Sequence, residues 1–149
     1  MAETAVQQDI LIVEDNDDDF EAAERALIRK RGIDNPIRRF RDGAEVWDYL
    51  TGSGRFQGAG AARPPGLVLL DLNMPGLDGR QVLARIKARD DLARIPVVIM
   101  TTSVDQRDVD RCYAEGANTY MRKPVSWQEF SDSMAQLYDY WFRYALRPK

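Results

Sequence analysis

Short apolar runs restrict the fold of this chain more than any other feature of the sequence. The clearest are Ile10–Val13, Leu67–Leu70 and residues 95–100. Runs that are apolar at every position, instead of at alternate positions, are typical of parallel strands buried on both faces. Between them lie segments whose apolar residues recur three or four positions apart, as in amphipathic helices. This alternation predicts an α/β domain with one parallel sheet covered by helices on both faces.

The predicted elements follow from these patterns. We expect strands at five places, which are residues 10–13, 36–40, 67–70, 95–103 and 118–121. We expect helices after each strand, at residues 20–31, 45–50, 80–89, 109–116 and 126–146. We expect residues 51–66, rich in Gly and Pro, to form a connection without regular structure. The whole chain, 1–149, is predicted to be a single domain with a core over about 9–140, a helical extension over 141–149 and no output domain.

What the chain lacks also limits its function. It contains no histidine, which excludes Ser-His-Asp and Cys-His catalysis and His-ligated zinc. Its one cysteine, Cys112, excludes an internal disulfide. The net charge of −3, without a long basic run, argues against a nucleic-acid partner. No apolar stretch approaches the roughly 20 residues of a membrane span, and the start lacks a signal peptide's basic flank, so we expect a cytoplasmic protein.

Polar residues that can take part in catalysis or bind ligands lie at the ends of the predicted strands. Glu14 and Asp15 come after the first strand, Asp71 after the third, Thr101 in the fourth and Lys123 after the fifth. In parallel sheets, ligands bind outside the carboxyl ends of the strands. Three acids gathered there repel one another and call for a cation, and carboxylate oxygens are the ligands that Mg²⁺ prefers. An alternative stays open at this point, because acids in such loops also cap helices or form solvated charge runs.

The motifs around these residues resemble the receiver domain of two-component response regulators. They are ED at 14–15, LLDLNMPGLDG around Asp71, IMTTS around Thr101 and YMRKP at 120–124. Thr101 lies 30 residues after Asp71, and Lys123 lies 22 residues after Thr101, as in that family. The resemblance covers about residues 9–140. It implies a flavodoxin-like, doubly wound fold with five parallel strands in the order 2-1-3-4-5, followed here by an extended last helix.

The resemblance also implies how the site works. Asp71 is expected to accept a phosphoryl group from a phosphohistidine of a partner kinase, because the chain has no histidine of its own. Glu14, Asp15, Asp71 and the backbone carbonyl of Asn73 are expected to hold Mg²⁺. The protein is then a signalling switch or a phosphorelay carrier and not an enzyme.

Three further residues have roles implied by the family. Lys123 is expected to pair with a phosphoryl oxygen, with a cis bond to the proline that follows it. Thr101 is expected to donate a hydrogen bond to the new phosphoryl group. Tyr120 is then expected to move inward, into the space that the hydroxyl leaves. Thr102 departs from the small residue that many receivers have directly after the hydroxyl, and it could narrow access to the phosphoryl group.

The final helix is rich in aromatic residues. Its apolar positions recur three and four residues apart, and we expect them to cover the sheet: Trp127, Phe130, Met134, Leu137, Trp141 and Tyr144. An aromatic cluster on a helix end also matches the composition of protein interfaces. We therefore predict a symmetric homodimer through this end of the helix, with these residues at the interface: Tyr138, Trp141, Phe142 and Tyr144.

A narrower resemblance concerns the edges of the fold. The pattern TTSxxxxD at 101–108, the Gly/Pro-rich segment before the third strand and the aromatic ending resemble the small single-domain regulators that partner bacterial phytochromes. This resemblance implies a phytochrome histidine kinase as partner and dimerisation through the last helix.

Three other functions fit these residues less well than the switch. A Mg²⁺-dependent phosphohydrolase with an aspartate nucleophile usually carries DxD after its first strand, whereas here DLN follows the third. A degenerate receiver acting as a phosphorylation-independent scaffold is opposed by the intact acids, Thr101 and Lys123, and slightly favoured by Thr102. A flavin-binding role lacks the phosphate loop after strand one.

Overall fold

The core of the protein is a five-stranded parallel sheet in the order β2-β1-β3-β4-β5. The computed structural model describes residues 8–30, 32–58 and 64–148. The strands are β1 (Ile10–Val13), β2 (Ile37–Phe40), β3 (Leu67–Leu70), β4 (Val97–Thr101) and β5 (Thr119–Arg122). The predicted flavodoxin-like fold and its strand order are confirmed. The fourth strand is shorter than predicted, because the chain turns after Thr101 and leaves Ser103 in a loop.

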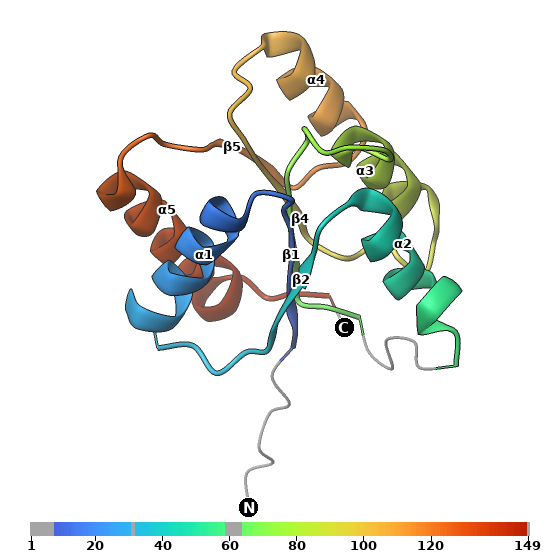
Figure 1. Ribbon diagram of the computed structural model, residues 1–149, viewed down its shortest axis with the longest axis horizontal. Coiled ribbons are helices and arrows are strands. Elements are labelled where there is room, and N and C mark those ends of the chain that lie inside the picture. Colours follow the sequence, from blue (N-terminus) through green and yellow to red (C-terminus); the bar gives the residue numbers. More distant parts are fainter. Residues whose placement is uncertain (1–7, 31, 59–63, 149) are drawn as a thin grey trace, which may run out of the picture.

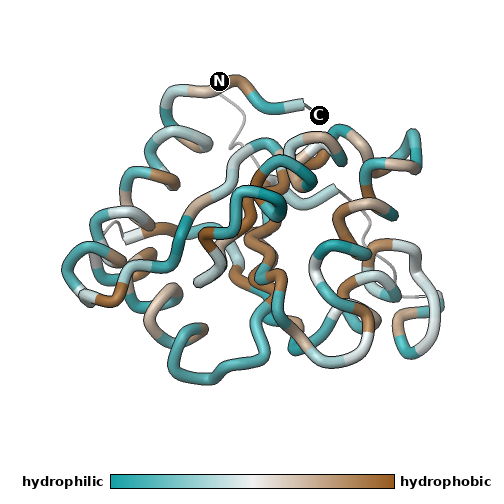
Figure 2. The backbone as a smooth tube through the Cα atoms, turned by 90° about the horizontal axis from the view of Figure 1, so that it is seen from above, coloured by the Kyte–Doolittle hydropathy of each residue, from teal (hydrophilic) through white to brown (hydrophobic). Residues whose placement is uncertain are grey.

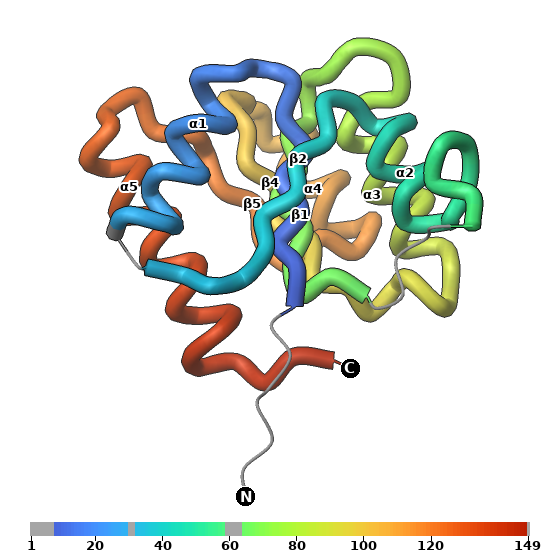
Figure 3. Tube along the Cα trace, turned by 60° about the horizontal axis from the view of Figure 1, so that its bottom comes forward, coloured from blue at the N-terminus to red at the C-terminus, as the bar shows by residue number. Residues whose placement is uncertain are grey.

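Helices cover both faces of the sheet, as Figure 1 shows. One face carries α1 (Asp17–Arg25), continued by the π-helical turn η1 (Ala26–Lys30), and α5 (Trp127–Asp139), continued by the π-helical turn η3 (Tyr140–Tyr144). The other face carries α2 (Gly43–Thr51), α3 (Gly79–Ala88) and α4 (Gln106–Ala114), with the short 3₁₀ turn η2 (Gly54–Phe56) after α2. Figure 3 shows the strands running between these two groups of helices.

The central strands are apolar because both of their faces are covered. Every residue of β1, β3 and β4 is buried, and the strands form the brown centre of the tube in Figure 2. One core cluster lies under α2, α3 and α4 and includes Val46, Ile86 and Cys112. The other lies under α1 and α5 and includes Leu27 and Met134. Burial of this apolar surface is the main stabilising term of such a fold.

The register of the sheet determines where the functional residues meet. Val13 of β1 lies opposite Leu70 of β3, so that these two strands end at the same level. Their continuations, Glu14 and Asp71, therefore emerge side by side. Thr101 lies opposite Arg122 at the end of β4 and β5, and the backbone N–H of Lys123 donates to the carbonyl of Thr101 at 2.7 Å. All four segments thus leave the sheet at one edge.

The last helix differs in part from the prediction. Phe130, Met134, Leu137 and Trp141 of the predicted stripe are buried, whereas Trp127 and Tyr144 are 44% and 78% exposed. The helix ends at Tyr144 in a π-helical turn, where the N–H of Ala145 donates to the carbonyl of Tyr140. Five-residue spacing in that turn ends the 3.6-residue periodicity, which explains why Tyr144 leaves the stripe.

Two aromatic residues predicted outside the stripe are partly buried against the core. Tyr138 and Phe142 stack on each other at 5.0 Å between ring centroids and contact the core cluster under α5. The Tyr138 hydroxyl donates to Asn35 Oδ1, and the Arg147 guanidinium lies over the Phe142 ring at 4.2 Å. Of the four residues predicted at a dimer interface, only Tyr144 is largely exposed. In the part of the chain that the structure describes, no helix combines the length and the apolar character needed to cross a membrane.

Candidate functional site

Three carboxylates meet where β1 and β3 end. Oxygen atoms of Glu14, Asp15 and Asp71 all lie within 4.8 Å of one another. Glu14 and Asp71 are buried, with 4% and 7% exposure, and Asp15 is exposed. The sequence placed these acids at one edge of the sheet, and the structure brings them together there.

The hypothesis that these acids only cap helices does not agree with the capping residues in the structure. The side chains that cap α1, α2, α3 and α4 belong to Asn16, Asp42, Asp78 and Asp105. None of the three clustered acids caps any of these helices. Capping therefore explains Asp42, Asp78 and Asp105 but not Glu14, Asp15 or Asp71.

Lys123 supplies the positive charge of the cluster. Its ammonium group binds Glu14 Oε1, Asp19 Oδ2 at 2.9 Å and Asp71 Oδ2 at 3.3 Å. The side chain is only 10% exposed. The peptide bond between Lys123 and Pro124 is trans, since no bond among the described residues is cis. The prediction of a cis bond is therefore wrong.

The electrostatics of the cluster favour a further cation. Burial raises the pKa of Glu14 to about 7, although the hydrogen bond from Lys123 opposes this rise; the charge of Asp71 adds to it. Burial lowers the pKa of Lys123, but its bonds to Glu14 and Asp19 outweigh that and raise the value. One ammonium group does not offset three buried or clustered carboxylates. The oxygen donors, in number and kind, fit a divalent cation such as Mg²⁺.

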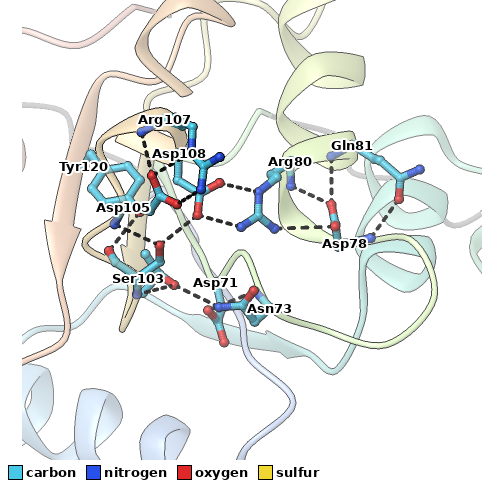
Figure 4. Close-up of polar contacts among 11 residues, drawn as sticks. Asp71, Asn73, Asp78, Arg80, Gln81, Ser103, Asp105, Arg107, Asp108 and Tyr120 are labelled. Carbon is cyan, nitrogen blue, oxygen red and sulfur yellow. Dashed lines mark hydrogen bonds and ion pairs between the residues drawn. The ribbon is translucent and has the colours of Figure 1, made fainter. Parts of the chain in front are cut away.

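The residues around Asp71 lie at the end of β4 and in the loops after β3 and β4. The N–H of Asn73 donates to Asp71 Oδ1 at 3.3 Å, and its side-chain amide donates to Thr101 Oγ1 at 3.5 Å. Thr101 is fully buried, and its hydroxyl oxygen also accepts from the N–H of Ser103 at 3.4 Å. Asn73, drawn beside Asp71 in Figure 4, thus links the Thr101 hydroxyl to Asp71 by these two hydrogen bonds. That the Asn73 carbonyl binds the metal stays a prediction.

Tyr120 already packs against the core in this structure. Its ring contacts the cluster under α2, α3 and α4, and its hydroxyl donates to the carbonyl of Ser103 at 2.9 Å. The inward movement of Tyr120, into the space that the Thr101 hydroxyl leaves after phosphorylation, stays a prediction.

Two residues of the site were missed by the sequence analysis. Asp19 binds Lys123, yet in the sequence it is one of three consecutive acids at the start of a helix and looks like a surface charge. Gly79 begins α3 directly beside the acceptor, where a Cβ atom would lie 2.1 Å from the carbonyl oxygen of Asp71. Only glycine allows this approach, which holds the backbone of Asp71 against α3. The signal that could have revealed it is the Asp-Gly pair that ends the turn after Asp71.

This arrangement can carry out one kind of chemistry well. The buried carboxylates of Glu14 and Asp71 and the ammonium group of Lys123 line one small pocket together with Asp19. Phosphoryl transfer to a carboxylate requires mainly positioning and the neutralisation of charge, and these groups provide both.

Comparison with known proteins agrees with this site. The model of the response regulator receiver domain family matches residues 10–135. The probable methanogenesis regulatory protein FilR2 of Methanothrix harundinacea is 37% identical over 139 residues, which cover 93% of this chain and 86% of that protein. The response regulator Rcp1 of Synechocystis is 34% identical over 139 residues, which cover 93% of this chain and 92% of that protein.

Solved structures give the same result. The phosphorylated cyanobacterial phytochrome response regulator RcpA has a TM-score of 0.89 at 33% identity, covering 97% of this chain and 100% of that one. The Mn²⁺-bound form of Rcp1 has a TM-score of 0.87 at 34% identity, covering 95% of this chain and 99% of that one. The cluster of Glu14, Asp15 and Asp71 could hold a metal ion. The chain therefore belongs to the response regulator receiver domain family of two-component signalling.

Proposed function

We propose that Asp71 of this receiver accepts a phosphoryl group from a phosphohistidine of a sensor histidine kinase, and that the protein acts as a switch and not as an enzyme. The observation that carries the proposal is the position of Lys123, whose ammonium nitrogen lies 3.3 Å from Asp71 Oδ2. A nucleophilic carboxylate beside a fixed ammonium group suits attack on phosphorus.

The transfer is a displacement at phosphorus. A carboxylate oxygen of Asp71 forms the new O–P bond while the P–N bond to the kinase imidazole breaks, and the leaving imidazole nitrogen keeps the electron pair and takes up a proton. When bound, the divalent cation neutralises charge on the phosphoryl oxygens. Lys123 leaves part of its pairing with Glu14 and Asp19 to bind one phosphoryl oxygen. Thr101 donates its hydroxyl hydrogen to another.

We infer that the partner kinase is a phytochrome. RcpA is described as a phytochrome response regulator, and this chain resembles it over nearly its full length. The surface that the kinase recognises must include the open side of the pocket, because the phosphohistidine has to reach Asp71.

The function is tested by labelling the protein with acetyl phosphate. With Mg²⁺ present, we expect the intact protein to gain the mass of one phosphoryl group, and with a chelator in place of Mg²⁺ we expect no gain. Labelling that does not depend on a divalent cation would contradict the proposed site. Absence of labelling with Mg²⁺ would favour the phosphorylation-independent scaffold, and steady turnover of an added phosphoester would favour the phosphohydrolase.

A homodimer through the end of the last helix is also proposed. Tyr140, Tyr144 and Leu146 are 56%, 78% and 99% exposed and lie close together in the sequence after α5. Exposed aromatic and leucine side chains in one segment are typical of interfaces. Trp141 was predicted at this interface but is buried in the core of its own chain. The interface that we propose is therefore formed by the exposed side chains of Tyr140, Tyr144 and Leu146.

The dimer is tested with a double variant, Tyr144→Ser with Leu146→Ser, in sedimentation at micromolar concentration. We expect the parent protein to sediment as a dimer and the variant as a monomer. The matched control is Tyr113→Ser on α4, also exposed, at 49%, which should leave the dimer intact. A monomeric parent protein, with and without phosphorylation, would refute the dimer.

A further inference from the structure

Ser103 is held by both its main chain and its side chain. Its hydroxyl donates to Asp108 Oδ2 at 2.7 Å, and its carbonyl accepts from the Tyr120 hydroxyl at 2.9 Å. Its N–H donates to Thr101 Oγ1 at 3.4 Å. Ser103 thus contacts both Thr101 and Tyr120, and Figure 4 shows it beside Tyr120 and Asp108. The position of Ser103 therefore bears on both Thr101 and Tyr120.

Asp108, the acceptor of the Ser103 hydroxyl, is fixed from α3. Arg80 donates to it through Nε at 2.8 Å and through a second guanidinium nitrogen at 2.9 Å, the two-point geometry that makes such pairs strong. Arg80 also lies 3.5 Å from Asp78, which caps α3. The hydrogen bonds from Arg80 and Ser103 lower the pKa of Asp108 to about 2. The pair therefore stays charged at neutral pH and ties α3 to the first turn of α4.

A simpler explanation is that Arg80 and Asp108 form an ordinary surface ion pair. Such pairs contribute about 0–1 kcal/mol and need no functional role. The neighbouring pair, Arg107 with Asp105, is of that kind, because the Arg107 side chain is 92% exposed. The Arg80 and Asp108 side chains are each only 20% exposed, and Asp108 also binds a residue beside the acceptor site. The contact with Ser103 therefore distinguishes the Arg80–Asp108 pair from the Arg107–Asp105 pair.

We propose that Arg80 and Asp108 are positioning residues for the phosphoryl site: their ion pair fixes the Ser103 hydroxyl, and Ser103 then holds Tyr120 against the core and Thr101 in place. Tyr120 is thereby kept against the core before any phosphoryl group arrives, so its position is set from α3 and α4 as well as from Asp71. The part of this proposal that concerns phosphorylation rests on the function proposed above, and the part that concerns Tyr120 does not.

The first readout is the environment of Tyr120 in protein without a phosphodonor. Tyrosines are labelled with fluorine, and the Tyr120 NMR signal is assigned with Tyr120→Phe. We expect a single signal from a core-packed ring in the parent protein. Asp108→Asn, Arg80→Gln and Ser103→Ala should each move at least half of the signal to the position of a solvent-exposed tyrosine. Arg107→Gln, which removes the same charge from the exposed pair, should leave the signal unchanged.

Ser103→Ala separates positioning from helix packing, because it keeps the ion pair and removes only the hydroxyl. If Tyr120 stays in place in Ser103→Ala but moves in Asp108→Asn, the pair acts by packing α4 on α3 and the proposal is overturned. It is overturned equally if Tyr120 stays in place in both Asp108→Asn and Arg80→Gln. Urea unfolding of each variant verifies that the signals come from folded protein.

The second readout is the rate of phosphorylation by acetyl phosphate with Mg²⁺. Small displacements of positioned groups lower rates strongly. We therefore expect Asp108→Asn to lower the rate at saturating acetyl phosphate on the order of 10-fold and to leave the half-saturating concentration within about twofold. A parent-like maximal rate would overturn the role in phosphorylation. Because the NMR readout requires no phosphodonor, a parent protein that takes no label would count against the proposed function without altering the Tyr120 result.

Discussion

An Asp71→Asn variant is expected to take up no phosphoryl group under conditions that fully label the parent protein. The amide nitrogen and oxygen of asparagine keep the size of the side chain but cannot attack phosphorus as a carboxylate does. The variant should fold at least as stably as the parent, because it removes one of three crowded negative charges and leaves Lys123 paired with Glu14 and Asp19.

Intact-protein mass spectrometry measures this outcome, and urea unfolding checks the fold. The matched control is Asp91→Asn, which removes an exposed carboxylate paired with Arg89 far from the pocket. This control should be labelled at the parent rate. Labelling of Asp71→Asn to the parent level would show that another side chain accepts the phosphoryl group.

Replacing Lys123 with glutamine is expected to lower stability and to slow phosphorylation together. The side chain is 10% exposed and is bonded to three carboxylates, two of them nearly buried. Removing one partner of a buried ion pair leaves charge without compensation and costs about 3 kcal/mol or more in the free energy of unfolding. The rate of labelling should fall on the order of 10²-fold, as when one preorganised donor is removed from a developing charge.

The same variant should bind Mg²⁺ more tightly than the parent, because the ammonium group no longer competes for Glu14 and Asp71. Calorimetric titration measures that affinity, and Mg²⁺ should raise the unfolding midpoint of Lys123→Gln more than that of the parent. Lys87→Gln is the control. Lys87 is also partly buried and donates to Ala93, Ile95 and Asn118 away from the pocket. Its replacement should cost stability without changing the labelling rate or the affinity for Mg²⁺.

Much of the fold could be predicted from the sequence because its strands are buried on both faces. Continuous apolar runs such as Leu67–Leu70 arise for that reason, and the polar residue after each run marks the functional edge of the sheet. Glu14, Asp71 and Lys123 could be predicted to lie close together because parallel strands end at one edge of the sheet. Their spacing along the chain then matched the receiver family.

What the sequence could not reveal depends on contacts between distant segments. Asp19 looks like one acid in a solvated run until β5 places Lys123 beside it. The tie between Arg80 and Asp108 spans 28 residues and follows no local pattern. Tyr138 and Phe142 fall outside a regular helical stripe, yet both pack partly buried against the core, and the Tyr138 hydroxyl donates to Asn35 of a distant segment. The π-helical turn at Tyr140–Tyr144 shifts the last side chains in a way that no 3.6-residue pattern predicts.

The central claim is that the phosphoryl group is carried by Asp71, and locating the group in the parent protein tests it most directly. After labelling with acetyl phosphate and Mg²⁺, borohydride reduces an aspartyl phosphate to homoserine, and tandem mass spectrometry of the peptides identifies the converted residue. We predict homoserine at position 71 and at no other aspartate. Conversion at Asp15, Asp19 or any other acid, with Asp71 unchanged, would contradict the account.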